Sequence, residues 1–281
     1  MYRKLREFAW ALRAGADASR ECRSILQRFV QNEMRRQLEG TPRFQDPRRL
    51  LRNGYKVYSQ NDEDGMIAEI FHRIGTTTKR FIEFGVEDGL ETNSTFLLSQ
   101  GWNGCWIEAS KTGAARARQL FSTYPVEVVE ARMTVENADS LIGRLAGPGE
   151  LDLLSIDIDS NDYWIWKAIT SVKPRVVVIE YNATFPPFVR KTIDYNPNFD
   201  WDGSNYFGAS LGALAAIGAE KGYSLVGCCA AGVNAFFVRS DLVKDHFCSP
   251  FTAENHYEPA RYQLATRPSG HRAGIGPWVD V

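Results

Sequence analysis

The sequence predicts a doubly wound α/β fold with a mostly parallel, seven-stranded sheet that ends in an antiparallel hairpin, preceded by an N-terminal helical extension. Two observations predict it. From about residue 78 onward, short apolar runs alternate with helical stretches, as in βαβ units of a parallel sheet. Near the end of the sheet, only residues 230–234 separate two strand-like runs. Because this link is too short for a crossover helix, the two strands must be antiparallel.

The strands and helices follow from hydrophobic periodicity. The first, fourth and fifth strands are nearly continuous apolar runs, which is typical of strands buried on both faces of a parallel sheet. The expected strands are 80–86, 104–109, 126–133, 151–159, 175–182, 223–229 and 235–239. The expected helices are about 92–100, 111–122, 137–146, 162–170 and 208–221, together with one that carries Met66, Ile67, Ile70 and Phe71 at helical spacing.

The N-terminal region differs in charge from the rest of the chain. Residues 1–50 contain 12 Lys or Arg and 6 Asp or Glu, a local net charge of +6, whereas the whole chain carries −1. Apolar residues at helical spacing around 5–12 and 26–38 predict two amphipathic helices. We expect residues 1–54 to form a basic helical extension. It packs on the main domain or serves as a membrane-surface or dimerisation arm, so a homo-oligomer through these helices is one alternative.

The remaining chain divides into a main domain, 55–245, and a tail, 246–281, that is expected to be irregular. Within the main domain, residues 183–207 are rich in Pro, Asn and aromatic residues and fit neither the strand nor the helix period. This segment follows the fifth strand at the carboxyl edge of the sheet, where such folds bind ligands. We interpret it as a substrate cap; the alternative is a structured insertion.

Composition excludes several classes of protein. With 44% apolar and 24% charged residues, the chain is typical of a soluble globular protein, and its near-zero net charge gives no basic field for nucleic acid. A run of about 18 apolar residues is absent, so no transmembrane helix is expected, and the N-terminus lacks signal-peptide features. The cysteines are odd in number and scattered, which predicts a reduced, cytoplasmic protein without a disulfide framework or zinc site: Cys22, Cys105, Cys228, Cys229 and Cys248.

The end of the first strand is an acidic glycine turn. It reads Glu83-Phe84-Gly85-Val86-Glu87-Asp88-Gly89 and lacks the dinucleotide fingerprint GxGxxG. Its two glycines permit a tight turn and close approach of a ligand to the backbone. Because acidic side chains repel a pyrophosphate and attract positive charge, the turn favours S-adenosylmethionine, with its sulfonium and amino groups, over a nicotinamide dinucleotide.

Two further turns are candidates for the nucleoside part of such a ligand. Glu108 ends the second strand, where an acidic side chain can accept hydrogen bonds from both hydroxyls of a ribose; the alternative is a surface carboxylate. The turn after the third strand can approach an adenine ring through Glu136 or Asn137. Two interpretations are open for the segment upstream. In one, Gln60 and Asp64 close over the cofactor; in the other, Ser59 or Asn61 caps the helix that follows.

Carboxylates gather at the ends of the fourth and fifth strands. Alternation places Asp157 and Asp159 on one face, and Glu180 and Asn182 likewise share a face. Adjacent parallel strands bring the two sets together as hard oxygen ligands for Mg²⁺, Mn²⁺ or Ca²⁺. The alternative is that Asp157 holds the amino group of a ligand while Asp162 caps the next helix.

The histidines and the paired cysteines give no site. His72, His246, His256 and His271 show no metal-ligand spacing, and His256 is expected on the surface. Cys228 and Cys229 fall in a core strand, where free cysteine packs as a small apolar residue.

Over roughly residues 55–245 the chain resembles class I S-adenosylmethionine-dependent methyltransferases, which have a Rossmann-like fold, and it looks most similar to the FkbM-type group and related bacterial proteins. The residues that carry the resemblance are Ser59-Gln60 with Glu63-Asp64, Phe81 to Gly85 through Gly89, Asn93 to Thr95, Gly101-Trp102, Trp106 to Glu108, Leu153 to Asp159, Gly222-Tyr223 and the hairpin strand 234–239.

The resemblance implies a cofactor site around the methionine part and ribose of S-adenosylmethionine. It implies Glu83, Gly85 and Gly89 around the methionine part and Glu108 on the ribose. Together with the turns considered above, the expected cofactor-binding residues are Gln60, Glu83, Gly85, Gly89, Thr92, Asn93, Glu108, Ala109, Ser110, Asn137 and Asp157. One departure concerns the fourth strand, where FkbM-type sequences commonly read Asp-Val-Glu-Gly and this chain reads Asp157-Ile158-Asp159-Ser160. Asp157 with Glu180 and Asn182 is instead similar to the metal set of catechol-type and sugar O-methyltransferases.

These expectations combine into a function. The predicted activity is O-methylation of a hydroxyl of a sugar, a glycan or a small polyol-like metabolite, with Mg²⁺ or Mn²⁺ bound by Asp157, Asp159, Glu180 and Asn182. One alternative is a metal-independent methyltransferase in which Asp157 or Asp159 is the general base. Another is a cofactor-binding partner subunit without turnover.

Overall fold

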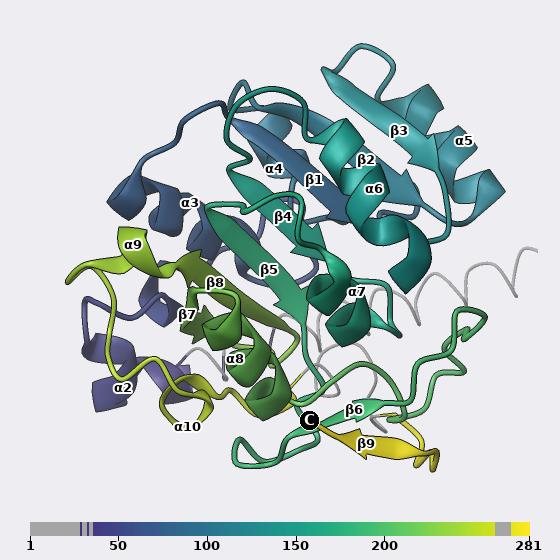
Figure 1. Cartoon of the computed structure of the whole chain (residues 1–281). Helices are drawn as coiled ribbons and strands as arrows, with labels where there is room; N and C mark the ends of the chain where they lie inside the picture. Colours follow the sequence, from purple (N-terminus) through teal and green to yellow (C-terminus); the bar gives the residue numbers. More distant parts are fainter. Residues whose placement is uncertain (1–28, 30–32, 34–35, 262–270) are drawn as a thin grey trace, which may run out of the picture.

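The computed structural model describes residues 29, 33, 36–261 and 271–281 (Figure 1). The first predicted N-terminal helix and most of the second lie outside the described residues. Residues 36–39 are helical and turn at Gly40, where the second helix was expected to end. Two short helices follow, α2 (Pro42–Gln45) and the 3₁₀ helix η1 (Leu51–Asn53).

The described part of the chain forms one seven-stranded sheet. Its strands are β1 (Arg80–Phe84), β2 (Asn103–Glu108), β3 (Val126–Glu130), β4 (Leu153–Ile156), β5 (Val176–Glu180), β7 (Tyr223–Cys228) and β8 (Asn234–Arg239). They lie in the order β3-β2-β1-β4-β5-β8-β7. Neighbours from β3 to β5 are parallel, whereas β8 is antiparallel to both β5 and β7. The predicted fold class, including its closing hairpin, is confirmed.

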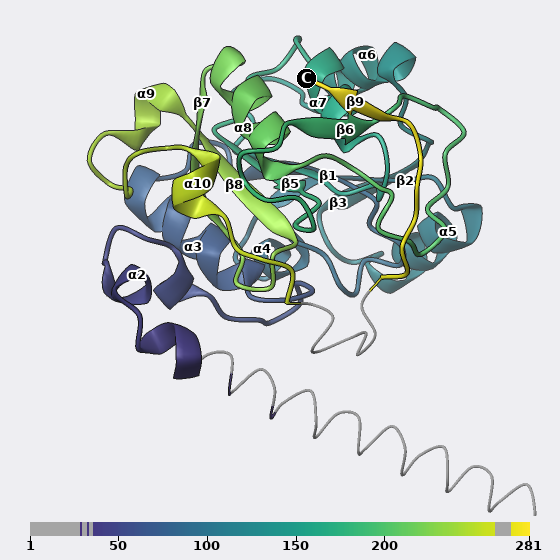
Figure 2. The same cartoon turned by 90° about the horizontal axis from the view of Figure 1, so that it is seen from below.

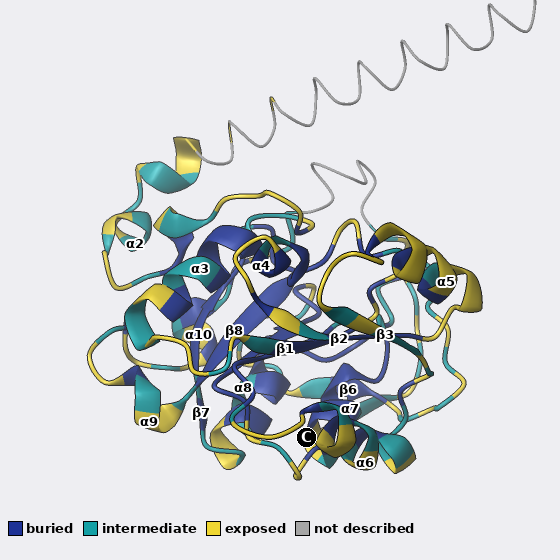
Figure 3. Ribbon diagram, turned by 90° about the horizontal axis from the view of Figure 1, so that it is seen from above, coloured by how far each residue is buried: buried dark blue, intermediate teal, exposed yellow. Residues whose placement is uncertain are grey.

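Helices cover both faces of the sheet (Figure 2). One layer contains α6 (Val135–Leu145), α7 (Asp162–Ala168) and α8 (Leu211–Glu220), and the other contains α3 (Glu63–Ile74), α4 (Thr95–Leu98) and α5 (Lys111–Leu120). Because side chains alternate along a strand, Ile82 of β1 packs into the first layer and Phe81 into the second. Apart from the edge strand β3, the strands are therefore mostly buried between two apolar cores, and they are mostly dark in Figure 3.

Several strands end earlier than the sequence predicts. β1 ends at Phe84, β4 at Ile156 and β5 at Glu180, so the polar residues that follow lie in loops and not on strand faces. Asp159 has a φ of 55°, a left-handed conformation that a strand does not contain. These loops bound the cleft described below.

The insertion and the tail pair with each other. The insertion contains β6 (Lys191–Ile193), which forms an antiparallel pair with β9 (Trp278–Asp280) (Figure 1). The Trp278 ring packs edge-on against Phe185, with ring centroids 4.7 Å apart. The expectation of an irregular tail is therefore corrected: residues 246–281 contain β9 and α10 (Ala253–His256), and α9 (Ser240–Val243) lies just before them. A three-residue strand shows no readable alternation, and its partner lies far away in the sequence.

His256 corrects a second expectation. Its side chain is buried, with 2% of the residue exposed, and Nε2 lies 3.0 Å from the Cys248 carbonyl oxygen. Burial, together with the charges of Arg49 and Arg43, lowers the pKa of His256 to about 3. Cys228 and Cys229 are both buried free thiols, as the packing interpretation predicts. In the part of the chain that is described, no helix has the length and apolarity needed to span a bilayer.

Candidate cofactor and cation site

A cleft opens at the carboxyl ends of β1 and β4. From β1 the chain proceeds to β2 and β3 on one side of the sheet and returns to β4 and β5 on the other, which makes this the topological switch point where such sheets bind ligands. The cleft has an outer arm of about 1000 Å³ and an inner arm of about 690 Å³, both including space open to solvent. The arms share Gly85, Glu87, Asp157 and Asp159.

Gly85 joins the two arms. Its φ is 72°, and an ideal Cβ on it would lie 1.7 Å from the carbonyl oxygen of Asp157. Only glycine fits there, because the backbone of Asp157 fills the space that a side chain would take. The predicted close approach of a ligand to Gly85 stays a prediction. Gly89 differs: a Cβ there would lie 2.6 Å from the Trp106 ring, and the residue lines neither arm. The predicted ligand contact of Gly89 is therefore corrected to a packing role.

Glu83 lies on the floor of the inner arm. Its carboxylate accepts hydrogen bonds from the backbone N–H of Asn93 (2.8 Å) and of Ser94 (3.0 Å), and from the hydroxyls of Ser155 (3.2 Å) and Ser94. Burial raises the pKa of Glu83, and these hydrogen bonds oppose the rise. The side chain thus fixes the loop that carries Thr92 and Asn93, both of which line the inner arm.

In the segment before α3, the residues for which the sequence left two roles open have different positions. Gln60 lines the inner arm. Asp64 lies behind it and accepts three hydrogen bonds, each 2.7–2.8 Å long, from the backbone N–H groups of residues 57–59. The Ser59 hydroxyl in turn accepts a hydrogen bond from the Asp64 N–H at 3.2 Å. Gln60 is therefore placed for a ligand, whereas Asp64 and Ser59 organise the start of the helix.

Glu108 lies at the end of β2 in the outer arm. One carboxylate oxygen accepts from the Glu87 N–H at 2.8 Å and the other from the Ser110 N–H at 2.6 Å. Because a carboxylate has about four acceptor positions, both oxygens retain capacity for the hydroxyls of a ribose. Ala109 also lines this arm. Ser110 does not, since its hydroxyl caps α5 by accepting from the Gly113 N–H.

Asn137 is not in the outer arm, which corrects its predicted contact with an adenine ring. Its side-chain oxygen accepts from the Thr134 N–H at 2.9 Å, and its amide group donates to the Arg132 carbonyl oxygen at 2.9 Å. The first of these bonds belongs to a capping box at the start of α6, and the Thr-x-x-Asn spacing is the signal that sequence reasoning overlooked. On this side the arm is lined by Ala131, Arg132 and Met133.

Three carboxylates meet where the two arms join. Asp157, Asp159 and Glu180 each place an oxygen within 4.8 Å of the others. Burial, followed by the charge of a neighbouring carboxylate, raises the pKa of Asp157 and of Glu180 well above the usual range. Oε2 of Glu180 is buried without a hydrogen-bond partner. A hard divalent cation fits this set, because it supplies the positive charge that the cluster lacks.

Asp162 holds the loop that carries two of these carboxylates. It accepts hydrogen bonds from the N–H groups of Ile158 (2.9 Å) and Ser160 (3.0 Å). Burial raises the pKa of Asp162 to about 7. The residue that precedes α7 as its N-cap is Asn161, so Asp162 fixes the loop from the first turn of the helix.

Asn182 is not part of the carboxylate cluster, which corrects the predicted ligand set. Its amide group donates to the carbonyl oxygens of Asn205 (2.9 Å) and Phe207 (3.0 Å), and its oxygen accepts from Thr184. β5 ends at Glu180, so alternation no longer governs the direction of residue 182. Asn234, which sequence reasoning did not name as a site residue, lines the inner arm opposite Glu180.

Among known proteins, only solved structures match this chain. Neither a family model nor a curated protein matches the chain. The N-terminal domain of EvdMO1 with SAH bound is 14% identical, covers 75% of this chain and 94% of its own, and has a TM-score of 0.39. Magnesium protoporphyrin IX methyltransferase from Synechocystis PCC 6803 with bound SAM is 13% identical, over 63% and 78%, with a TM-score of 0.41.

A third structure is an S-adenosylmethionine-dependent methyltransferase from Clostridium acetobutylicum. It is 11% identical, over 61% of this chain and 88% of its own, with a TM-score of 0.38. All three TM-scores are below 0.5, so these likenesses carry no argument about activity or substrate. The fold assignment rests on the sheet order of the chain itself.

Proposed function

We propose that the protein is an S-adenosylmethionine-dependent O-methyltransferase that acts with the help of a divalent cation, Mg²⁺ or Mn²⁺. The observation that carries the proposal is the charge of the switch-point cleft. Among the described residues, its inner arm is lined by six carboxylates and no basic side chain: Glu83, Glu87, Glu91, Asp157, Asp159 and Glu180. Such a cleft repels phosphate and attracts a sulfonium, an ammonium or a metal ion.

The two arms suit the two halves of the cofactor. Glu108 in the outer arm is the acceptor for the ribose hydroxyls, and the apolar side chains of Ile107, Met133 and Ile158 nearby suit the adenine ring. Gly85 lines both arms, so the chain of the ligand would pass beside it from the outer arm into the inner arm. There the carboxylates face the amino and sulfonium groups, which places the methyl group near the junction of the arms.

The carboxylates at that junction act on the acceptor. Asp157, Asp159 and Glu180 would hold the cation, which supplies positive charge to neighbouring substrate oxygens and lowers the pKa of the attacking hydroxyl. The hydroxyl would lose its proton to solvent in the open cleft, and its oxygen would then bond to the methyl carbon as the bond from that carbon to sulfur breaks, so that S-adenosylhomocysteine leaves. Most of the rate enhancement then comes from positioning and electrostatics.

The proposed acceptor is a hydroxyl of a sugar, a glycan or a small polyol-like metabolite, because adjacent hydroxyls offer a cation two oxygens. The aromatic residues of the insertion support this class. Phe199 and Trp201 line the outer arm beside Asp159, and flat rings of this kind offer a surface for the apolar face of a sugar.

A second candidate is a metal-independent methyltransferase with an aspartate base. Burial and the Asp159 charge raise the pKa of Asp157, and this favours the second candidate because it makes the carboxylate a stronger base than an ordinary aspartate. The two candidates differ in one respect: methyl transfer that persists in EDTA supports the base, and transfer restored by Mn²⁺ supports the cation.

Calorimetric titration tests the proposal. S-adenosylmethionine is titrated into the full chain in EDTA and then in Mg²⁺ or Mn²⁺. We expect micromolar binding that weakens about tenfold in Glu108→Gln, in line with about 1.5 kcal/mol for hydrogen bonds to a charged group. A separate heat on adding metal should be lost in Asp157→Ala. Absence of cofactor binding under both conditions would refute the methyltransferase proposal, and binding without transfer to any hydroxylated acceptor would indicate a cofactor-binding subunit.

A further inference from the structure

Asn234 begins β8 directly opposite Glu180, the last residue of β5. Opposed residues of an antiparallel pair have Cβ atoms about 5 Å apart on the same face of the sheet. Both side chains line the inner arm. Asn234 is 2% exposed, and its Oδ1 is buried without a hydrogen-bond partner, as is Oε2 of Glu180. Two orphaned oxygens thus lie side by side in the cleft, and such groups are costly unless a ligand occupies them.

Glu63 fixes which end of the Asn234 amide faces the cleft. Glu63 Oε1 accepts a hydrogen bond from Asn234 Nδ2 at 3.1 Å. A carboxylate accepts and does not donate, so the amide nitrogen must face Glu63 and the amide oxygen must point away from it. Glu63 is itself held, since its Oε2 accepts from the Asn61 N–H at 2.8 Å.

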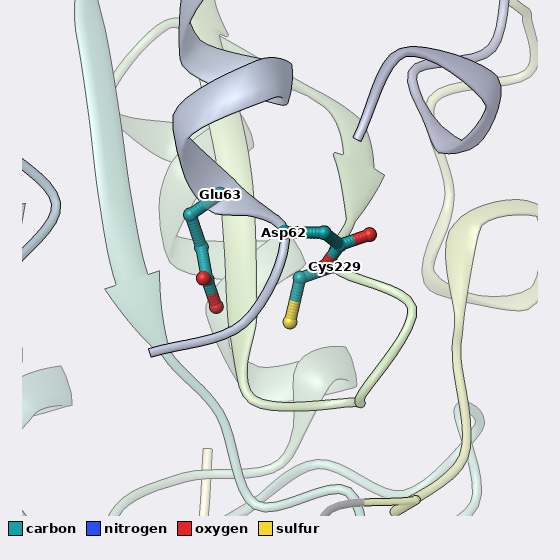
Figure 4. Close-up of side chains that lie close together, drawn as sticks. All are labelled: Asp62, Glu63 and Cys229. Carbon is teal, nitrogen blue, oxygen red and sulfur yellow. The ribbon is translucent and has the colours of Figure 1, made fainter. Parts of the chain in front are cut away.

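The start of α3 also clamps the turn that carries Asn234 (Figure 4). Asp62, Glu63 and Cys229 lie close together there and resemble a metal site. Each, however, already has protein donors: Asp62 accepts from the Ala230 N–H at 3.2 Å, and the Cys229 sulfur accepts from the N–H groups of Val233 (3.2 Å) and Asn234 (3.1 Å). This cluster, the α3 clamp, therefore positions the β7–β8 turn.

We propose that Oδ1 of Asn234 is a further ligand of the cation held by Asp157, Asp159 and Glu180, and that Glu63 is the positioning residue that turns this oxygen into the cleft. The inference rests on the metal-assisted form of the proposed function. A neutral amide oxygen adds a hard ligand to three carboxylates without adding negative charge, and carbonyl oxygens suit Mg²⁺, Mn²⁺ and Ca²⁺. Asn234 thus takes the role that the sequence had given to Asn182.

A titration with Mn²⁺ tests the assignment. The full chain is first stripped of metal with EDTA, and Mn²⁺ is then added while the electron paramagnetic resonance signal of free Mn²⁺ is measured. Asn234→Ala should raise the Kd for Mn²⁺ by about tenfold or more. Glu63→Gln should raise it by about tenfold, since outer-shell partners of metal ligands typically contribute that much. Asn182→Ala is the matched control: it removes another buried asparagine, and we expect a lower melting temperature with an unchanged Kd.

An Asn234→Ala protein that binds Mn²⁺ as tightly as wild type would overturn the assignment, and so would a wild-type protein that binds no Mn²⁺. If Asn234→Ala does not fold, Glu63→Gln decides, because it preserves side-chain volume; an unchanged Kd then overturns the proposal. S-adenosylmethionine binding in EDTA, measured in parallel, separates the two hypotheses. If the protein binds the cofactor but not Mn²⁺, the cation site is refuted and the proposed cofactor site stands. If it binds Mn²⁺ in a manner that depends on Asn234 but does not bind the cofactor, the cation site stands and the proposed cofactor site is refuted.

Discussion

The carbonyl oxygen of Asp157 lies where a side chain on Gly85 would begin, 1.7 Å from an ideal Cβ. This contact joins the ends of β1 and β4 at the switch point of the sheet. Gly85→Ala would push the two loops apart and would also place alanine at a φ of 72°, which costs about 1–2 kcal/mol by itself. We expect a loss of about 3 kcal/mol or more in the free energy of unfolding, together with loss of cofactor binding.

Gly101→Ala is the matched control for this substitution. Gly101 has a similar φ of 78°, but nothing lies within 4 Å of its Cβ position. Urea denaturation should show only the backbone cost of about 1–2 kcal/mol, and the Kd for S-adenosylmethionine should not change. If the two alanine variants lost equal stability, the close approach at Gly85 would not be the cause.

Asn137→Ala tests whether Asn137 serves the helix and not the cofactor. One of its side-chain hydrogen bonds closes the capping box of α6 and the other binds the Arg132 carbonyl oxygen, so we expect a loss of about 1 kcal/mol in the free energy of unfolding. Calorimetry should give the wild-type Kd for S-adenosylmethionine. A weakened Kd at unchanged stability would restore the contact with the adenine ring that the sequence predicted.

Asp152 offers a prediction at the opposite edge of the sheet, before β4. Its buried carboxylate accepts from the N–H groups of Thr77, Thr78 and Lys79 and lies 3.2 Å from Arg175 Nε. Removing one partner of a buried ion pair typically costs about 3–5 kcal/mol, so we expect that loss for Asp152→Asn in urea denaturation.

The exposed pair of Lys191 and Asp280 is the comparison for Asp152. The Asp280 side chain is 83% exposed, and surface ion pairs contribute about 0–1 kcal/mol. Asp280→Asn should therefore leave the unfolding curve nearly unchanged. Similar losses in the two variants would mean that burial does not set the strength of these pairs.

His256 predicts a dependence of stability on pH. Burial lowers its pKa to about 3, against an ordinary value of 6.5, so the folded protein keeps the ring neutral while the unfolded chain takes up a proton below pH 6.5. Stability from this group is present above pH 6.5 and is lost as the pH falls towards 3. Between pH 7 and 5 the loss is about 2 kcal/mol, at 1.36 kcal/mol per pKa unit.

His256→Gln isolates this contribution, because other titrating groups are common to both proteins. Denaturation at pH 7 and pH 5 should show that the variant loses about 2 kcal/mol less than wild type over this interval. Equal losses in the two proteins would place the acid sensitivity elsewhere.

Local patterns in the sequence determined the sheet and part of the site. Buried parallel strands require continuous apolar runs, and residues 230–234 are too few for a crossover helix, so the strands and the closing hairpin followed from periodicity and link length. The same reasoning placed Glu83, Gly85 and Glu108 at strand ends, because the carboxyl ends of parallel strands share one edge of the sheet.

The tertiary structure alone decided which side chains meet at that edge. Alternation holds only while a strand continues, and β5 ends at Glu180, so Asn182 turns to the insertion while Asn234 comes to face Glu180 across an antiparallel pair. The burial of His256 beside Arg43 and Arg49 and the pairing of β6 with β9 likewise depend on residues far apart in the chain. Periodicity reports the local direction of the backbone, whereas these contacts arise from packing between distant segments, which no local pattern records.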